Sequence, residues 1–80
     1  MDTEKRIFTD TLLTAFLHFK NFSVKPLSNS QKLISFEVSG ENLSDVISEF
    51  YTNPKIPILA FIQSYKTIRS MIFNLKEGQK

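Results

Sequence analysis

Basic and aromatic side chains recur near the C-terminal end of this 80-residue chain. Lys66, Arg69, Phe73 and Lys76 follow one another at spacings of three, four and three residues. Such spacing places the four side chains on one flank of a helix. Cations neutralise phosphates, and an aromatic ring can stack on an unpaired base for about 1 to 3 kcal/mol. The pattern predicts a nucleic-acid-binding flank, with single-stranded nucleic acid favoured.

The same flank has two other interpretations. Lys and Arg side chains beside an apolar stripe commonly cover apolar surface with their stems while their charges stay in water. An acidic protein partner could also dock on the flank, which Leu59 and Ile62 extend. Residues 51–80 hold five basic residues and one acidic residue, whereas residues 1–50 hold five basic and seven acidic residues. This asymmetry points to an anionic partner of either kind.

The only histidine, His18, is the first residue to consider for acid–base chemistry. It follows Thr11 and Thr14 at helical spacings, opposite a run of leucine and phenylalanine. The spacing predicts that His18 lies on a solvated stripe, outside the core, and that it is not catalytic.

Other chemical signatures are missing from the sequence. Gly40 and Gly78 are the only glycines, which excludes a phosphate-binding loop and a dinucleotide-binding fingerprint. The chain has no cysteine, and its carboxylates form no tight cluster, so no metal site is predicted. Glu41, Asp45 and Glu49 recur at intervals of four, as like charges on a solvated helix face would. We therefore predict a protein that is not an enzyme and uses no cofactor.

Length and composition indicate one folded domain, residues 1–80. Hydrophobic residues make up 41% and charged residues 22% of the chain, a balance typical of folded domains. The longest apolar run, residues 58–62, is too short to span a membrane. The polar start, MDTEKR, lacks the apolar region of a secretory signal. These features predict a cytoplasmic protein.

The first elements are a short apolar step and a helix. Ile7-Phe8 could form a strand or simply lead into the helix. Thr9 is placed to cap the helix, with Asp10 in the first turn, and the helix should end near Asn21. Its predicted apolar face contains Leu12, Leu13, Ala15, Phe16, Leu17 and Phe19.

Two runs of alternating side chains then predict a β-hairpin. Residues 22–27 read as an edge strand, because Pro26 cannot donate to a ladder. Residues 28–31 form the turn, and residues 32–39 form the clearest strand. Its inward face has Ile34, Phe36 and Val38. The outer face of the hairpin is a second candidate surface for a nucleic-acid backbone, without the aromatic pair of a stacking platform; it has Ser23, Lys25, Leu27, Leu33, Ser35 and Glu37.

Two helices complete the predicted chain. Gly40 should end the hairpin, and Asn42 should cap a helix with apolar residues at Leu43, Val46, Ile47 and Phe50. After a stiff connector at residues 53–57, Pro57 is placed as the first residue of a helix that runs to about Lys76. The predicted core stripe of this last helix contains Ile58, Phe61, Tyr65, Ile68, Ile72 and Leu75, with Ile62 beside it.

The order β-α-β-β-α-α predicts an α+β fold. A small antiparallel sheet, formed by the hairpin with or without the N-terminal strand, should have its apolar face covered by the three helices.

Four segments of the chain resemble a family of small domains of unknown function from bacteria, archaea and their phages and plasmids. They are FTD at 8–10, KLISFEV at 32–38, Tyr51, and FIQSYKTIR at 61–69. The chain departs from the family pattern after the first helix, where Lys20-Asn21 stands in place of an expected glycine. The resemblance implies a helix and hairpin module from a mobile-element context, and it implies no activity.

We therefore expect a small non-catalytic binding protein. The first hypothesis is a nucleic-acid-binding accessory protein of phage or mobile-element type. The alternatives are a protein-interaction module that inhibits or adapts a host protein, and a structural homodimer, because apolar side chains occur on more than one side of the first and last helices.

Overall fold

The computed structural model describes residues 3–28 and 34–77 of the chain. The elements are β1 (Thr3–Phe8), α1 (Thr11–Phe19), β2 (Ser23–Ser28), β3 (Ile34–Glu41), α2 (Leu43–Phe50) and α3 (Ile58–Glu77). This order confirms the predicted α+β fold, and it shows that Ile7-Phe8 belongs to a strand of six residues. The predicted turn at residues 28–31 lies largely outside the described residues.

The three strands form one antiparallel sheet in the order β1-β3-β2. The central strand, β3, pairs with both neighbours, and Phe36 lies opposite Phe8 on one side and Pro26 on the other. Alternation along β3 buries Phe36 and Val38 and directs Glu37 to the opposite face. The predicted inward face of this strand is therefore confirmed.

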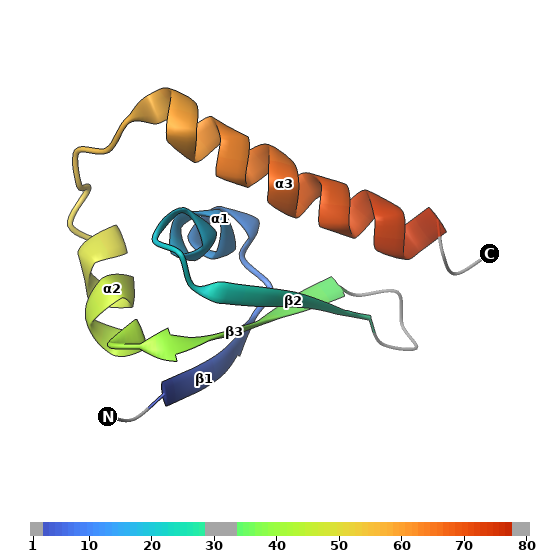
Figure 1. Cartoon of the computed structure of the whole chain (residues 1–80), viewed down its shortest axis with the longest axis horizontal. Coiled ribbons are helices and arrows are strands. Elements are labelled where there is room, and N and C mark those ends of the chain that lie inside the picture. The colour runs from blue at the N-terminus through green and yellow to red at the C-terminus, as the bar shows by residue number, and fades with distance from the viewer. Residues whose placement is uncertain (1–2, 29–33, 78–80) are drawn as a thin grey trace.

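Two of the three helices, α1 and α3, cover one face of the sheet in two layers, and α2 lies at one end of the sheet (Figure 1). In Figure 1, α1 lies over the sheet and α3 crosses on the far side of α1. The fully buried side chains come from all three levels, because Leu17 of α1, Phe36 of β3 and Ile68 of α3 belong to one hydrophobic cluster. α1 is thus enclosed between the sheet and α3.

Both ends of α1 are closed by side-chain and backbone hydrogen bonds. Asp10, and not Thr9, is the N-cap, and its carboxylate accepts the backbone N–H groups of Leu12 at 2.9 Å and Leu13 at 3.1 Å. Asn21 has a positive φ of 72° after the last turn. The Asn21 N–H donates to His18 O at 2.9 Å, and the Phe22 N–H donates to Leu17 O at 3.0 Å. Asparagine tolerates this left-handed conformation, so Asn21 fills the role of the expected glycine.

Gly40 lies inside β3 and does not end the strand, contrary to the prediction. It is opposite Glu4 of β1, and β3 continues to Glu41. A Cβ atom at Gly40 would lie 2.3 Å from Cδ1 of the Phe22 ring. Glycine is therefore required here by the close approach of this ring, and not by a turn.

The start of α3 differs by one residue from the prediction. Pro57 precedes the helix, and its carbonyl accepts the Phe61 N–H at 3.1 Å, so Pro57 is the cap and Ile58 is the first helical residue. Within residues 3–28 and 34–77, no helix combines the length and apolar character needed to cross a membrane.

Candidate functional site

The side of α3 that points away from α1 carries an exposed stripe of apolar and basic side chains. We call Ile58, Leu59, Ile62, Lys66, Arg69 and Phe73 the outward stripe of α3; all six are exposed. Ile58 is 64%, Leu59 79% and Phe73 64% exposed. The opposite side of the helix contributes Ser64, Ile68 and the half-buried Tyr65 to the interior. Since α3 contains no carboxylate before Glu77, the stripe carries positive charge only.

The prediction that Ile58 belongs to the core stripe is wrong, and Ile62 beside it is also exposed. The reason is the direction of α3. It crosses α1 instead of running along it, and in Figure 1 the N-terminal end of α3 lies farther from the sheet than its C-terminal end. Within residues 58–75 the buried positions of α3 are Ser64 and Ile68, so the burial that periodicity predicts for Ile58 does not occur.

The two cations of the stripe differ in their surroundings. Arg69 donates from Nη1 to the Tyr65 hydroxyl at 3.2 Å, and its guanidinium carbon lies 5.9 Å from the centre of the Tyr65 ring. This contact uses one of the five guanidinium N–H donors and holds the group close to the helix. Lys66 is exposed one turn earlier. The backbone of Lys76 continues α3, but its side chain lies outside the described residues.

His18 does not lie on a solvated stripe, and that prediction is wrong. Its Nδ1 atom lies 3.0 Å from Oγ of Ser64 on α3. Thr14, predicted to share the same solvated side, is fully buried, and its hydroxyl donates to the Asp10 carbonyl at 2.8 Å. α3 covers the side of α1 that the sequence assigns to water.

The His18–Ser64 pair brings together a base and a nucleophile, yet its surroundings favour a structural role. Ser64 is only 8% exposed, so its hydroxyl is not presented to a substrate. The pair instead links α1 to α3 through a hydrogen bond between the half-buried His18 and the buried Ser64, whose hydroxyl thereby has a partner.

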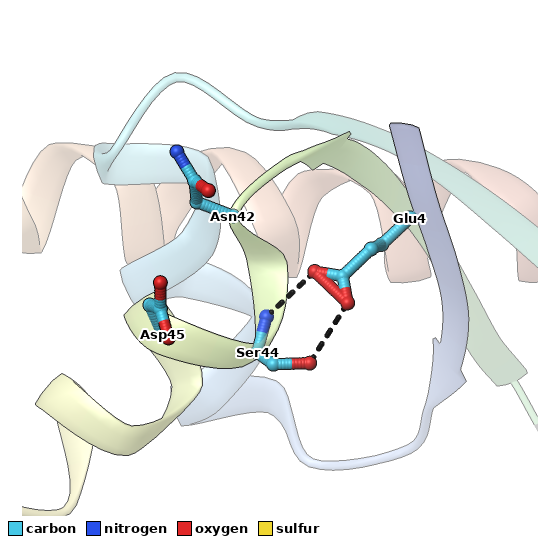
Figure 2. A pocket seen from close by; sticks show the side chains of 4 residues that line it. All are labelled: Glu4, Asn42, Ser44 and Asp45. Atoms are coloured by element: carbon cyan, nitrogen blue, oxygen red, sulfur yellow. Dashed lines mark hydrogen bonds between the residues drawn. The ribbon is translucent and has the colours of Figure 1, made fainter. Parts of the chain in front are cut away.

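An open hollow of about 370 Å³ lies where β1 meets the start of α2 (Figure 2). Glu4, Asn42, Ser44 and Asp45 line it. The Glu4 carboxylate accepts both the backbone N–H and the hydroxyl of Ser44, each at 2.9 Å. Arg6 donates from Nη2 to the same hydroxyl oxygen at 3.0 Å. In Figure 2 the Glu4 side chain points at Ser44 across the hollow.

These contacts show that Glu4, and not Asn42, caps α2. Asn42 has a φ of 61° and makes no side-chain capping bond, because the left-handed conformation turns its side chain from the N–H groups ahead. Within the described part of the chain, no three His, Asp or Glu side chains gather where they could hold a metal ion. The side chains that line the hollow thus form a helix cap for α2, and the capping carboxylate comes from β1.

Replacing Glu4 by glutamine should lower the free energy of unfolding in a pH-dependent way. The hydrogen bonds from the Ser44 N–H and hydroxyl, aided by Arg6, hold the pKa of Glu4 below its ordinary value of 4.5. Because the pKa of Glu4 is lower in the folded than in the unfolded state, its ionised carboxylate stabilises the fold at pH values above the ordinary pKa. This contribution disappears as the pH falls through the lowered pKa. The wild-type advantage should be present at pH 7 and shrink at acidic pH, as measured by urea denaturation at both. Glu41→Gln, at an exposed position of β3, controls for the loss of charge, and equal stability of Glu4→Gln and wild type at pH 7 would contradict the prediction.

The open face of the sheet is a weaker candidate surface. Lys5 and Ile7 of β1 join the predicted outer face of the hairpin there, and Leu33 lies outside the described residues. Glu37 lies at 3.9 Å from Lys5 and opposite Lys25 in the ladder. The carboxylate partly neutralises both lysines, so the outward stripe of α3 is the more strongly basic surface.

Comparison of the chain with models of known protein families, with curated protein sequences and with solved structures finds no match.

Proposed function

We propose that the chain is a non-catalytic protein that binds single-stranded nucleic acid through the outward stripe of α3. The observation that carries the proposal is the exposed ring of Phe73, which shares the stripe with the exposed side chains of Lys66 and Arg69. A phenylalanine ring in contact with water contributes little to the stability of the fold. A base stacked on it gains about 1 to 3 kcal/mol, because both flat surfaces leave water together.

The spacing of the cations supports the same conclusion. Arg69 is four residues before Phe73, and Lys66 is three residues before Arg69. Neighbours at these spacings lie roughly 5 to 6 Å apart at their Cβ atoms. A strand laid along α3 would therefore place phosphates at Lys66 and Arg69 while a base reaches Phe73. Lys66 and Arg69 are the only charged donors of the stripe, and both are assigned here to phosphates, which favours binding without strong sequence preference.

An acidic protein is a second candidate ligand, and the exposure of Ile58 and Leu59 favours it. Aliphatic side chains offer nothing to a phosphate, but each buries apolar surface against a protein at about 25 cal/mol per Å². Such a partner would place apolar side chains on the first turn of α3 and carboxylates at Lys66 and Arg69.

Reversing both charges, Lys66→Glu with Arg69→Glu, should abolish binding of nucleic acid and leave the fold intact. The measurement is fluorescence anisotropy of labelled single-stranded and double-stranded oligonucleotides at low and moderate salt. We expect at least a tenfold weaker affinity at low salt, and a salt slope smaller by about 1.4 for single strands, since two phosphate contacts are lost. The free energy of unfolding should change by no more than about 0.5 kcal/mol, because both side chains are exposed.

Two controls separate the candidates. Lys25→Glu with Lys55→Glu makes the same change of net charge at exposed positions outside the outward stripe and should leave binding nearly unchanged. Ile58→Ser with Leu59→Ser should also spare binding of nucleic acid but weaken capture of an acidic protein. If the wild type binds neither form of oligonucleotide at tens of micromolar and low salt, the first proposal is wrong.

A further inference from the structure

The two edges of the sheet differ in their capacity to accept another strand. The order β1-β3-β2 leaves β1 and β2 with one free edge each. Pro26 lies in the middle of β2 and has no N–H to donate, so that edge is interrupted. β1 contains no proline, and its register with β3 runs without a bulge from Thr3 to Phe8. In Figure 1, β1 lies along the border of the sheet, with no other described element along its outer side.

The charges of β1 are complementary to those of the same strand turned around. Residues opposite each other in an antiparallel pair point to the same face of the sheet. A two-fold axis at Lys5 would place Glu4 of one copy opposite Arg6 of the other, twice. Opposite charges in such positions stabilise a pair of strands, whereas an axis at Arg6 would oppose two arginines.

The remaining positions are compatible with an axis at Lys5. The two Lys5 side chains would meet on the open face, where each has Glu37 of its own copy at 3.9 Å to offset the repulsion. The exposed Ile7 side chain would lie opposite Thr3 of the second copy and lose contact with water.

We propose that β1 pairs with β1 of a second copy of this chain, antiparallel and centred on Lys5. The two three-stranded sheets then join into one of six strands. The same patch serves both copies, so the assembly is closed. Its outermost strands are both β2, and Pro26 prevents further growth there. This inference stands independently of the ligand of α3.

Cysteine cross-linking tests the pairing directly, because the natural chain contains no cysteine. Across an antiparallel ladder, Cα atoms of opposed residues lie about 4.5 to 5.5 Å apart, within the range that a disulfide spans. Lys5→Cys should therefore form a covalent dimer rapidly under mild oxidation. Lys25→Cys, exposed on the same face but on the edge with Pro26, should react at least tenfold more slowly.

Sedimentation equilibrium of the unmodified protein supplies the second measurement. We expect a monomer–dimer equilibrium, and Arg6→Glu should weaken it at least tenfold by opposing Glu4 of one copy to a new carboxylate of the other. Lys25→Glu controls for the change of charge away from the edge of β1. Arg6→Ala loses the same contact with Ser44 Oγ without adding a carboxylate, and it should weaken the dimer less than Arg6→Glu. A wild type that stays monomeric up to millimolar concentration would overturn the proposal. Equal cross-linking rates for Lys5→Cys and Lys25→Cys would do the same.

Discussion

Replacing Phe36 by alanine should lower the free energy of unfolding by about 3 to 5 kcal/mol. Phe36 is fully buried in the central strand, opposite Phe8 of β1 and Pro26 of β2. Its ring therefore lies at the middle of the sheet face that α1 covers. Truncation removes the buried ring and leaves a cavity that three paired strands cannot close. A domain of 80 residues has a total stability of roughly 4 to 12 kcal/mol, so this one change removes a large share of it.

Urea denaturation followed by circular dichroism measures the loss. Phe73→Ala is a matched control, because it makes the same chemical change at a ring that is 64% exposed. It should change stability by no more than about 0.5 kcal/mol while weakening binding of single strands. A cost below about 1 kcal/mol for Phe36→Ala would mean that Phe36 does not lie in a packed core.

Gly40→Val sets strand propensity against packing, and we expect packing to dominate. Valine favours strands, so local propensity alone predicts a neutral or stabilising change. A Cβ atom at Gly40, however, would lie 2.3 Å from Cδ1 and 2.6 Å from Cε1 of the Phe22 ring. The ring packs against the hydrophobic cluster and cannot move without displacing its neighbours. Overpacking of this kind costs about 1 to 3 kcal/mol, and the branched side chain should fall at the upper end of that range.

A double-mutant cycle identifies the ring as the cause. In a Phe22→Ala background the space above Gly40 is open, so Gly40→Val should become neutral or stabilising. The coupling free energy between the two positions should reach about 1 to 3 kcal/mol. If Gly40→Val costs the same with and without the ring, the reason for glycine in β3 lies elsewhere.

The two proposed binding surfaces are in different layers of the fold. The outward stripe of α3 lies beyond α1, and the free edge of β1 lies on the border of the sheet (Figure 1). Charge reversal at Lys66 and Arg69 should therefore leave self-association unchanged, and Arg6→Glu should leave the fold of α3 unchanged. A dimer joined at β1 would carry two outward stripes.

Local sequence patterns were sufficient for most of the secondary structure. Alternation along residues 34–38 predicted that Phe36 and Val38 face the interior, because a strand with one buried face repeats every two residues. Leu43, buried at the start of α2, followed in the same way from helical periodicity. Pro26 indicated an edge strand, since a proline removes a ladder donor wherever it stands. Each of these three predictions depends only on residues within one segment of the chain.

Neither the cap of α2 nor the role of Gly40 could be read from local sequence. Glu4 reaches Ser44 from 40 residues away, and Phe22 occupies the space beside Gly40 from the connection between α1 and β2. A capping signature within one segment pointed to Asn42 because asparagine usually serves there. Only the antiparallel pairing of β1 with β3 brings Glu4 to the helix.

The order of the elements and the inward face of the central strand follow from local sequence patterns. Which polar residues are buried and which apolar residues face water depends on how the elements pack together. Thr14 is buried and His18 is half-buried because α3 packs on the side of α1 opposite the sheet. Ile58 is exposed because the N-terminal end of α3 lies away from the sheet (Figure 1). Periodicity specifies the faces of a helix, but burial depends on what packs against each face, and that is set by elements distant in the chain.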